Sequence, residues 1–364
     1  MTARKILTEK RVLSALLACA FLITLLISGF AEAANGMPPK RKPRVSPLLL
    51  EAQESFAPLP DKPIFKKDNP GLNAKLSLGK MLFFDTRLSK SNVFSCNSCH
   101  NLATGGVDNN QFSTGHKWQI GGRNAPTVLN ASLHVAQFWD GRAEDVEAQA
   151  QGPILAGVEM GATKELVIKR LESIPQYVTL FKEAYPDDKK PLTYKHVGDA
   201  IGAFERMLIT PSRFDIYLKG HENALANAEK KGLKTFMEKG CGSCHDGMGI
   251  GGHGYRKFGL HGTPKNMKDK GRYEVTKDKE DINVFKVPSL RNIELTYPYF
   301  HDGRHWTLEA AVKDMGKYQL GEKLSDKEVA SIVIFLKSLT GSPPKRLIPI
   351  LPPSTATTPI PDRN

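Results

Sequence analysis

Cysteine and histidine form the same short pattern twice in this 364-residue chain. The first C-x-x-C-H motif consists of Cys96, Cys99 and His100, and the second consists of Cys241, Cys244 and His245. Positions i, i+3 and i+4 share one face of a helical turn. Two thiols at this spacing can form thioethers with one edge of a porphyrin, while the next imidazole binds the iron. Both motifs therefore predict covalent attachment of a c-type haem.

Three other uses of paired cysteines fit this chain less well. A zinc ribbon usually places its cysteine pairs roughly 15–20 residues apart, whereas Cys99 and Cys241 are separated by far more sequence. A redox dithiol is expected beside a strand–helix pattern, which we do not find here. Two structural disulfides would leave His100 and His245 without a role. We therefore favour two haems, which together use every cysteine after residue 33.

Residues 1–33 are typical of a secretory signal peptide. Basic residues precede an apolar run from Val12 to Phe30, and Ala31-Glu32-Ala33 has the small-x-small pattern of a cleavage site. The run is also long enough to span a bilayer, so an uncleaved N-terminal membrane anchor is the alternative. Either interpretation predicts that the rest of the chain lies outside the cytoplasm, in the periplasm.

The composition is that of an ordinary globular protein with a basic surplus. Hydrophobic residues make up 40% of the chain, which excludes collagen, a coiled coil and a polytopic membrane protein. The formal net charge is +13. Export argues against a nucleic-acid partner, so the charge indicates a solvated lysine-rich surface or docking to an acidic protein or anionic membrane. The composition of residues 34–48 predicts a basic Pro-rich linker, and that of residues 343–364 predicts a loose Pro-rich tail.

Apolar residues recur at three- and four-residue spacing in several segments, which predicts helices. These segments are Leu76–Phe84, Lys164–Leu171, Lys195–Leu208, Ala224–Glu238 and Leu308–Met315. A last helix is expected after a capping box that begins at Ser325. The Gly/Lys-rich stretch from Gly247 to Asp281 is typical of a loop. We therefore predict an all-α fold with two cytochrome c-like haem domains in tandem, residues 49–215 and 216–342.

Two further pairs of segments repeat at one common offset. Residues 125–130 (APTVLN) are echoed by residues 287–292 (VPSLRN), and residues 138–142 (FWDGR) are echoed by residues 300–304 (FHDGR). A shared offset is expected when two domains descend from one ancestor. The sequence therefore predicts that the two haem domains are related by an internal duplication.

The sixth ligand of each iron decides what that haem can do. Methionine opposite histidine raises the reduction potential, whereas an open position permits chemistry. Met315 is the candidate ligand for the second haem, and the repeat offset places Pro153, which cannot bind iron, at its counterpart. His116 is the candidate partner for the first haem. From spacing alone, Met315 and His116 could equally pack in a core, Glu159 could be a general acid or a solvated carboxylate, and Trp139 could be a core residue.

Several longer stretches resemble those of one family, the bacterial dihaem cytochrome c peroxidases. The resemblance covers nearly all of residues 76–341. Besides the haem motifs it rests on LGKMLFFD (78–85), GHKW (115–118), RNAPTVLN (123–130), QFWDGRA (137–143) and PYFH (298–301). It implies that the chain reduces hydrogen peroxide to water with two electrons and two protons. A small c-type cytochrome or a copper protein would supply the electrons.

The same resemblance implies a role for each candidate residue. His100 would be the proximal ligand of the peroxidatic haem and His116 its removable ligand, while His245 and Met315 would hold the electron-transfer haem. The remaining roles would be the acid and amide of the peroxide pocket (Glu159 and Gln149), the tryptophan between the haems (Trp139), and calcium binding by Asn124 and the backbone carbonyls of Thr296 and Pro298.

Two other functions stay open. A related dihaem enzyme modifies tryptophan residues of a partner protein and uses tyrosine where Met315 is proposed here, and Tyr318 lies close by in sequence. A dihaem electron carrier without catalysis would need neither Glu159 nor Gln149, nor an exchangeable His116. The resemblance also makes a homodimer an expectation.

Overall fold

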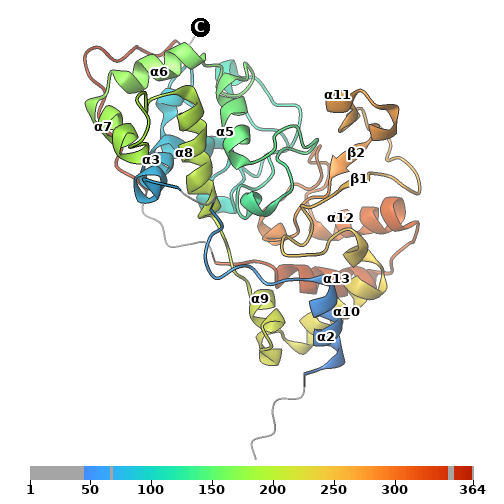
Figure 1. The fold of residues 1–364 in the computed structure, drawn as a ribbon. Helices are drawn as coiled ribbons and strands as arrows, with labels where there is room; N and C mark the ends of the chain where they lie inside the picture. The colour runs from blue at the N-terminus through green and yellow to red at the C-terminus, as the bar shows by residue number, and fades with distance from the viewer. Residues whose placement is uncertain (1–44, 66–68, 343–347, 363–364) are drawn as a thin grey trace, which may run out of the picture. The chain divides into compact units, whose positions relative to one another are not determined.

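The structure, a computed structural model, describes residues 45–65, 69–342 and 348–362. Its helices are α2 (Pro47–Ser55), α3 (Leu72–Phe84), α4 (Cys96–Cys99), α5 (Val146–Leu155), α6 (Lys164–Glu172), α7 (Pro175–Ala184), α8 (Tyr194–Arg206), α9 (Arg213–Leu218), α10 (Asn227–Glu238), α11 (Tyr273–Thr276), α12 (Leu308–Asp314) and α13 (Asp326–Lys337). The described chain is mostly helical (Figure 1). The helices predicted from apolar spacing all form, with bounds within a few residues of those expected.

Helices α3, α5, α7 and α8 surround the first hydrophobic core. Leu78 and Phe83 of α3 are fully buried there, as is Ile201 of α8. The two helices approach closely at Gly79, because a Cβ added to this residue would lie 1.8 Å from the carbonyl oxygen of Ala200. Only glycine permits this approach.

A second hydrophobic core forms around α9, α10, α12 and α13. Phe335 of α13 packs edge-on against Phe214 of α9, with ring centroids 5.2 Å apart. The predicted capping box is present, since the Ser325 hydroxyl accepts a hydrogen bond from the Glu328 N–H and the Glu328 carboxylate accepts one from the Ser325 N–H. The described chain therefore has two separate cores, one for each haem motif.

The stretch expected to be a loop contains regular structure. It holds β1 (Tyr255–Lys257), which pairs in antiparallel fashion with β2 (Val284–Lys286), and the short helix α11. The register places Tyr255 opposite Lys286 and Arg256 opposite Phe285. Strands of three residues are too short to show an alternating apolar pattern, so the loop prediction was wrong here for a simple reason of length.

The two echoed sequence segments adopt matching local geometry. Asn130 and Asn292 both have a left-handed backbone, and both side-chain amides donate to the hydroxyl of Thr210, at 2.7 and 2.8 Å. Phe138 and Phe300 also share a positive φ, of 65° and 71°. One buried hydroxyl thus joins equivalent asparagines from the two halves of the chain.

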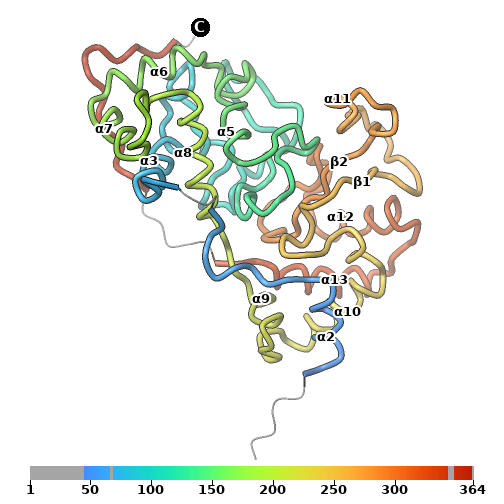
Figure 2. Tube along the Cα trace, in the orientation of Figure 1, coloured from blue at the N-terminus to red at the C-terminus, as the bar shows by residue number. Residues whose placement is uncertain are grey.

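The two ends of the described chain each pack where the sequence did not predict. Helix α2, assigned from sequence to the linker and the first haem domain, buries Leu49 and Ala52 in the second core. Phe56, the residue after α2, contacts Phe214 and Phe236 there. Residues 348–362, expected to be part of a loose tail, lie along α6 and α7 of the first domain (Figure 2). The N-terminal helix therefore packs with the second domain, and the C-terminal segment packs on the first.

The predicted signal peptide, residues 1–33, and most of the predicted linker lie outside the residues that the structure describes. Within the part of the chain that the structure describes, we find no helix with the length and apolar character needed to cross a bilayer.

A buried ion pair joins the two segments that flank the second core. Arg291 donates from Nη1 and Nη2 to the carboxylate of Asp215, at 3.0 and 2.9 Å, and both side chains are almost completely buried. The same carboxylate accepts the N–H groups of Leu59 and Ser212. Burial alone would raise the pKa of Asp215, but Arg291 and these hydrogen bonds hold it below its usual value. The carboxylate therefore stays charged at neutral pH.

We expect Asp215→Asn to lower the free energy of unfolding by about 3–5 kcal/mol at neutral pH, because it leaves the Arg291 charge buried without a counterion. Because the pKa of Asp215 is lower in the folded protein than in the unfolded chain, its carboxylate stabilises the fold fully above the unfolded-state pKa. This stabilisation is lost as the pH falls through the folded-state pKa. Denaturant titration at several pH values would measure both effects. Asp61→Asn, which breaks an exposed pair with Lys219, is the control. Equal losses in the two variants would contradict the argument.

Candidate haem sites

The first haem motif lies in the short helix α4. The Ser95 N–H donates to the Ser98 hydroxyl at 2.9 Å, which fixes the start of the turn that carries both cysteines. Burial raises the pKa of Cys96, and it raises the pKa of Cys99 to about 11. Reactive redox thiols have lowered pKa values. The environment of these cysteines therefore fits covalent attachment better than dithiol exchange.

His116 sits in a tightly folded loop whose backbone is strained. Lys117 and Trp118, which follow it, both have positive φ values, 58° and 60°. Two consecutive residues with side chains in the left-handed region are costly and persist only when their surroundings fix them. The His116 N–H donates to the Glu159 carbonyl at 2.7 Å, and a Cβ on Gly161 would lie 2.8 Å from the His116 ring. The segment 159–161 thus holds the imidazole in place.

Buried ring nitrogens without hydrogen-bond partners occur in five histidines of the described residues, His134, His301 and three of the predicted iron ligands. In these ligands they are Nδ1 of His100, Nδ1 of His245 and both ring nitrogens of His116. Burial lowers the pKa of all three imidazoles, and that of His245 falls to about 4. A neutral imidazole is the form that binds metal. Burying such nitrogens without partners is unfavourable, so these side chains fit residues that bind iron.

Glu159 lies next to His116, whose N–H donates to its carbonyl. Burial raises the pKa of its carboxyl group, with Arg142 partly offsetting the effect. Its charge adds to the effects that raise the pKa of Cys96 and Cys99. Gln149 lies half-buried on α5, whose C-terminal end leads into the turn that carries Glu159. A carboxyl group that retains its proton at higher pH suits proton transfer.

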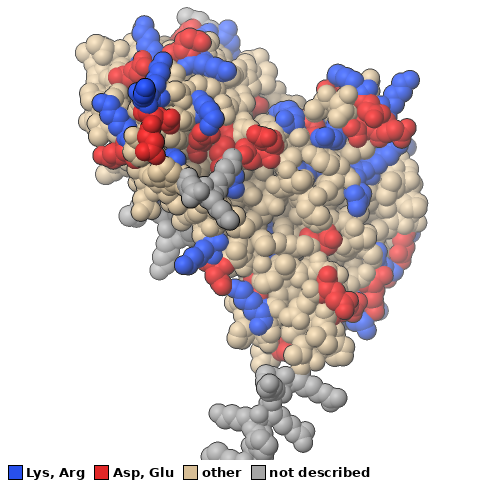
Figure 3. All heavy atoms as spheres, viewed as in Figure 1, with Lys and Arg blue, Asp and Glu red and all other residues tan. Residues whose placement is uncertain are grey.

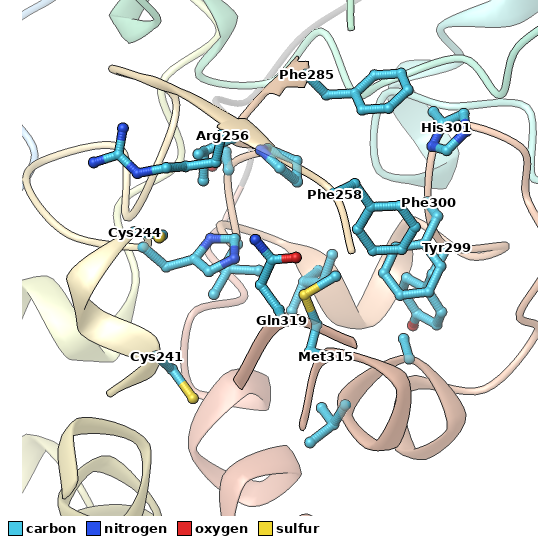
Figure 4. Close-up of a pocket in the computed structure, with 18 of the residues that line it drawn as sticks. Cys241, Cys244, Arg256, Phe258, Phe285, Tyr299, Phe300, His301, Met315 and Gln319 are labelled. Atoms are coloured by element: carbon cyan, nitrogen blue, oxygen red, sulfur yellow. The ribbon is translucent and has the colours of Figure 1, made fainter. Parts of the chain in front are cut away.

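The second haem motif opens onto a large apolar cavity (Figure 4). Cys241, Cys244, His245 and Met315 all line this one cavity. The structure therefore brings together all four residues that the sequence assigned to the second haem. Burial raises the pKa of Cys241 to about 11. The apolar lining comes from both halves of the chain and includes Pro126 and Phe138 from the first and Phe258, Phe285, Leu308 and Leu336 from the second.

Met315 begins a six-residue π-helical turn, η9 (Met315–Leu320), that follows α12. Such turns are rare and occur often at functional sites. The turn is held against the β1 loop by Gln319, whose amide donates to the Lys257 carbonyl and accepts from the Gly259 N–H. Tyr318, on the same turn, is not among the residues that line the cavity. The helical distortion therefore presents the methionine, and not the nearby tyrosine, to the cavity.

Trp139 connects the two halves of the chain. Its indole N–H donates to the Asn124 carbonyl at 2.9 Å, and its own carbonyl accepts the Lys286 N–H at 2.8 Å. The indole also lines the second cavity. The three residues expected to bind calcium, Asn124, Thr296 and Pro298, line the same cavity. This places Trp139 and the proposed calcium ligands in one region.

Sequence reasoning missed a buried cation in the second cavity. Lys286 is only 6% exposed, and burial lowers its pKa to about 8. Its ammonium lies 3.4 Å from Nδ1 of His134, and no salt bridge to it is found among the described residues. Figure 4 shows Arg256 and Phe285, its neighbours in the strand pair, at the end of the pocket away from Cys241. Isolated lysines are usually exposed, so nothing in the sequence marked this one.

Comparisons with known proteins agree with this geometry. Residues 73–223 match the family model described as di-haem cytochrome c peroxidase, and residues 229–340 match the model described as cytochrome c. The cytochrome c551 peroxidase of Pseudomonas aeruginosa is 49% identical over 85% of this chain and 91% of its own length. The chain belongs to the di-haem cytochrome c peroxidase family. It carries two haem-related domains in tandem.

Other members of the family are also similar to this chain. The cytochrome c551 peroxidase of Nitrosomonas europaea is 49% identical over 88% of this chain and 98% of its own length. The methylamine utilization protein MauG of Methylorubrum extorquens is 35% identical over 79% of this chain and 84% of its own length. A crystal structure of a MauG-like protein associated with microbial copper homeostasis has a TM-score of 0.70 at 29% identity, covering 78% of this chain and 95% of that one.

Proposed function

We propose that this chain is a dihaem cytochrome c peroxidase that reduces hydrogen peroxide to water. The observation that carries the proposal is the difference between its two haem sites. The second has a methionine, Met315, in the cavity with its haem motif. The first has Glu159, whose carbonyl accepts the His116 N–H and whose carboxyl group has a pKa raised by burial. One site is thus equipped to store an electron and the other to move a proton. The curated relatives at 49% identity are named cytochrome c551 peroxidases.

In the proposed mechanism the haems, when bound, would supply single electrons and an iron centre for peroxide. His100 and His116 would bind the first iron, and His245 and Met315 would bind the second. Glu159 would accept a proton from one peroxide oxygen and deliver it to the other, and Gln149 would orient the bound peroxide. For peroxide to enter, His116 must leave its place against segment 159–161.

The proposal extends to the surroundings of the two sites. Asn124 with the carbonyls of Thr296 and Pro298 would bind calcium next to Trp139, the residue proposed to lie between the haems. The matching geometry of Asn130 and Asn292 supports an internal duplication. The predicted leader supports a periplasmic location, with cleavage or membrane anchoring of that leader as its two forms.

The electron donor would be a small c-type cytochrome or a copper protein. Figure 3 shows acidic and basic side chains interspersed on one face of the molecule, which supports a solvated charged surface there. A homodimer is part of the proposal on family grounds alone. Sedimentation with and without calcium would test it.

Replacing Met315 with histidine should lower the reduction potential of the second haem, because histidine opposite histidine stabilises the oxidised iron more than methionine does. Potentiometric titration of the purified protein would measure the change. Met248→His, a substitution outside the residues that line the cavity, is the control. An unchanged potential in the Met315 variant would mean that this methionine does not bind the iron.

Replacing Lys286 with glutamine should also lower that potential, because a buried positive charge favours the reduced haem. We expect reduction to become about tenfold less favourable, which corresponds to about 59 mV for one electron. Lys268→Gln, an exposed lysine on the same connection, should leave the potential unchanged. If the reduction potential falls equally in both variants, the overall surface charge and not the buried Lys286 sets the effect.

A stopped-flow experiment tests the function directly. The dihaem protein is reduced by one electron with calcium present and then mixed with peroxide and a reduced cytochrome c. The proposal expects rapid loss of peroxide with two cytochromes oxidised for each peroxide consumed. If electrons pass between the cytochrome and the protein but peroxide persists, the chain is a dihaem electron carrier.

A further inference from the structure

The C-terminal segment, residues 348–362, is fixed to the first haem domain by a series of hydrogen bonds. The Thr355 hydroxyl donates to the Ser173 carbonyl at 2.9 Å, and the Ser173 hydroxyl is 2.8 Å from that of Thr358. Arg87 donates to the Ser354 hydroxyl at 3.2 Å. We call this segment the C-terminal strap. These contacts fix residues 354–358 to the folded domain.

A buried arginine joins the strap to residues 87–90. Arg170 is 1% exposed, and its Nη1 donates to the carbonyls of Arg87 and Ser89 at 2.8 and 2.5 Å. Its Nη2 donates to the carbonyl of Lys90 at 3.0 Å and to that of Ile360, in the strap, at 3.3 Å. Because charged donors make strong hydrogen bonds, Arg170 holds Lys90 and the strap together.

Lys90 then connects the strap to the segment that supports His116. Its carbonyl accepts the Asp362 N–H at 3.1 Å, and its ammonium is 3.0 Å from the Asp362 carboxylate. On the other side, the Lys90 N–H donates to the Met160 carbonyl at 2.8 Å. Met160 is the residue between Glu159 and Gly161. Both of those residues contact His116.

The junction therefore links the end of the strap to the imidazole that the proposed mechanism must displace. A continuous set of contacts runs from Asp362 through Lys90 and Met160 to His116.

We propose that the C-terminal strap, acting through Lys90, positions segment 159–161 and thereby holds His116 over the first haem. Lys90 and Asp362 are then positioning residues, because they act on His116 through segment 159–161. This inference rests on the proposed function, because it assumes that His116 is the removable ligand. Loosening the strap should shift the resting protein toward the released state of His116.

Truncation after Ser342 tests the proposal in the oxidised dihaem protein. The readout is the ratio of five-coordinate high-spin to six-coordinate low-spin signal at the first haem, measured by electron paramagnetic resonance and absorption. Losing one to two net hydrogen bonds' worth of support should raise this ratio about tenfold. Truncation should also reduce the dependence of peroxide consumption on prior reduction.

Point variants keep the test valid if the truncated chain folds poorly. Asp362→Lys sets two cations against each other and should raise the high-spin ratio, whereas combining it with Lys90→Asp restores opposite charges and should return the ratio toward normal. Thr357→Ala, whose described hydroxyl contact stays within the strap, is the control.

A lowered thermal stability with an unchanged spin ratio would overturn the inference, because the strap would then be only structural. A high-spin first haem already present in the full-length oxidised protein would overturn it as well. Failure of the proposed function is a separate result: neither the full-length nor the truncated protein would then consume peroxide after one-electron reduction, whatever the spin ratio.

Discussion

The oxidised His116→Gly variant should consume hydrogen peroxide at once, without the one-electron reduction that the unaltered protein is expected to need. Glycine removes the imidazole that would occupy the sixth position of the first iron, and it leaves that position open. The loop should tolerate the change, because glycine keeps the backbone N–H of residue 116 that donates to the Glu159 carbonyl. Stopped-flow mixing of fully oxidised protein with peroxide would measure the effect.

His221→Gly is the matched control for this experiment. His221 is exposed and lies just before the 3-10 turn η5 (Glu222–Ala224) in the second domain. It should need prior reduction as the unaltered protein does. If the His116 variant still requires a reductant, His116 does not close the first site, and another step must account for activation.

Replacing Glu159 with glutamine should preserve peroxide binding and slow turnover by about 10²–10⁴-fold, the range that a positioned proton-transfer group contributes. Glutamine has nearly the same shape, but its amide cannot accept and return a proton. Burial raises the pKa of the Glu159 carboxyl group, so it holds a proton more readily than a surface glutamate. Single-turnover mixing separates the binding step from the later loss of peroxide.

Glu165→Gln provides the comparison, because this glutamate is exposed in the first turn of α6 and close to Glu159 in sequence. The Glu165→Gln variant should consume peroxide at the normal rate. A normal rate in the Glu159 variant would remove this residue from the mechanism. Weakened peroxide binding with an unchanged chemical step would make it a binding group.

The sequence predicted the haem motifs and the main helices because both depend on local patterns. Six residues determine the two attachment sites, and a period of 3.6 residues marks each amphipathic helix. Helix α5 escaped this reasoning because Pro153 lies inside it, and proline normally argues against a helix interior. The strands β1 and β2 escaped because each has only three residues.

Non-local contacts account for the remaining differences. Lys286 is buried by segments far away in sequence, and nothing near it distinguishes it from the exposed lysines. The sequence predicted a loose tail because the hydrogen-bond partners of the strap, such as Arg170 and Ser173, lie far away in the sequence, in the first haem domain. For Met315, spacing offered a plausible ligand, and the cavity added the observation that it lies with His245. Its role as an iron ligand stays a prediction.

The exchange of chain ends has a consequence for modularity. Helix α2 completes the second core although it comes first in the chain, and residues 348–362 cover the first domain although they come last. A gene fragment cut near residue 215 would therefore encode neither half with its own covering segment. Recombination that transplanted one haem domain would have to carry sequence from both termini. This arrangement favours inheritance of the two haem domains together, as a single unit.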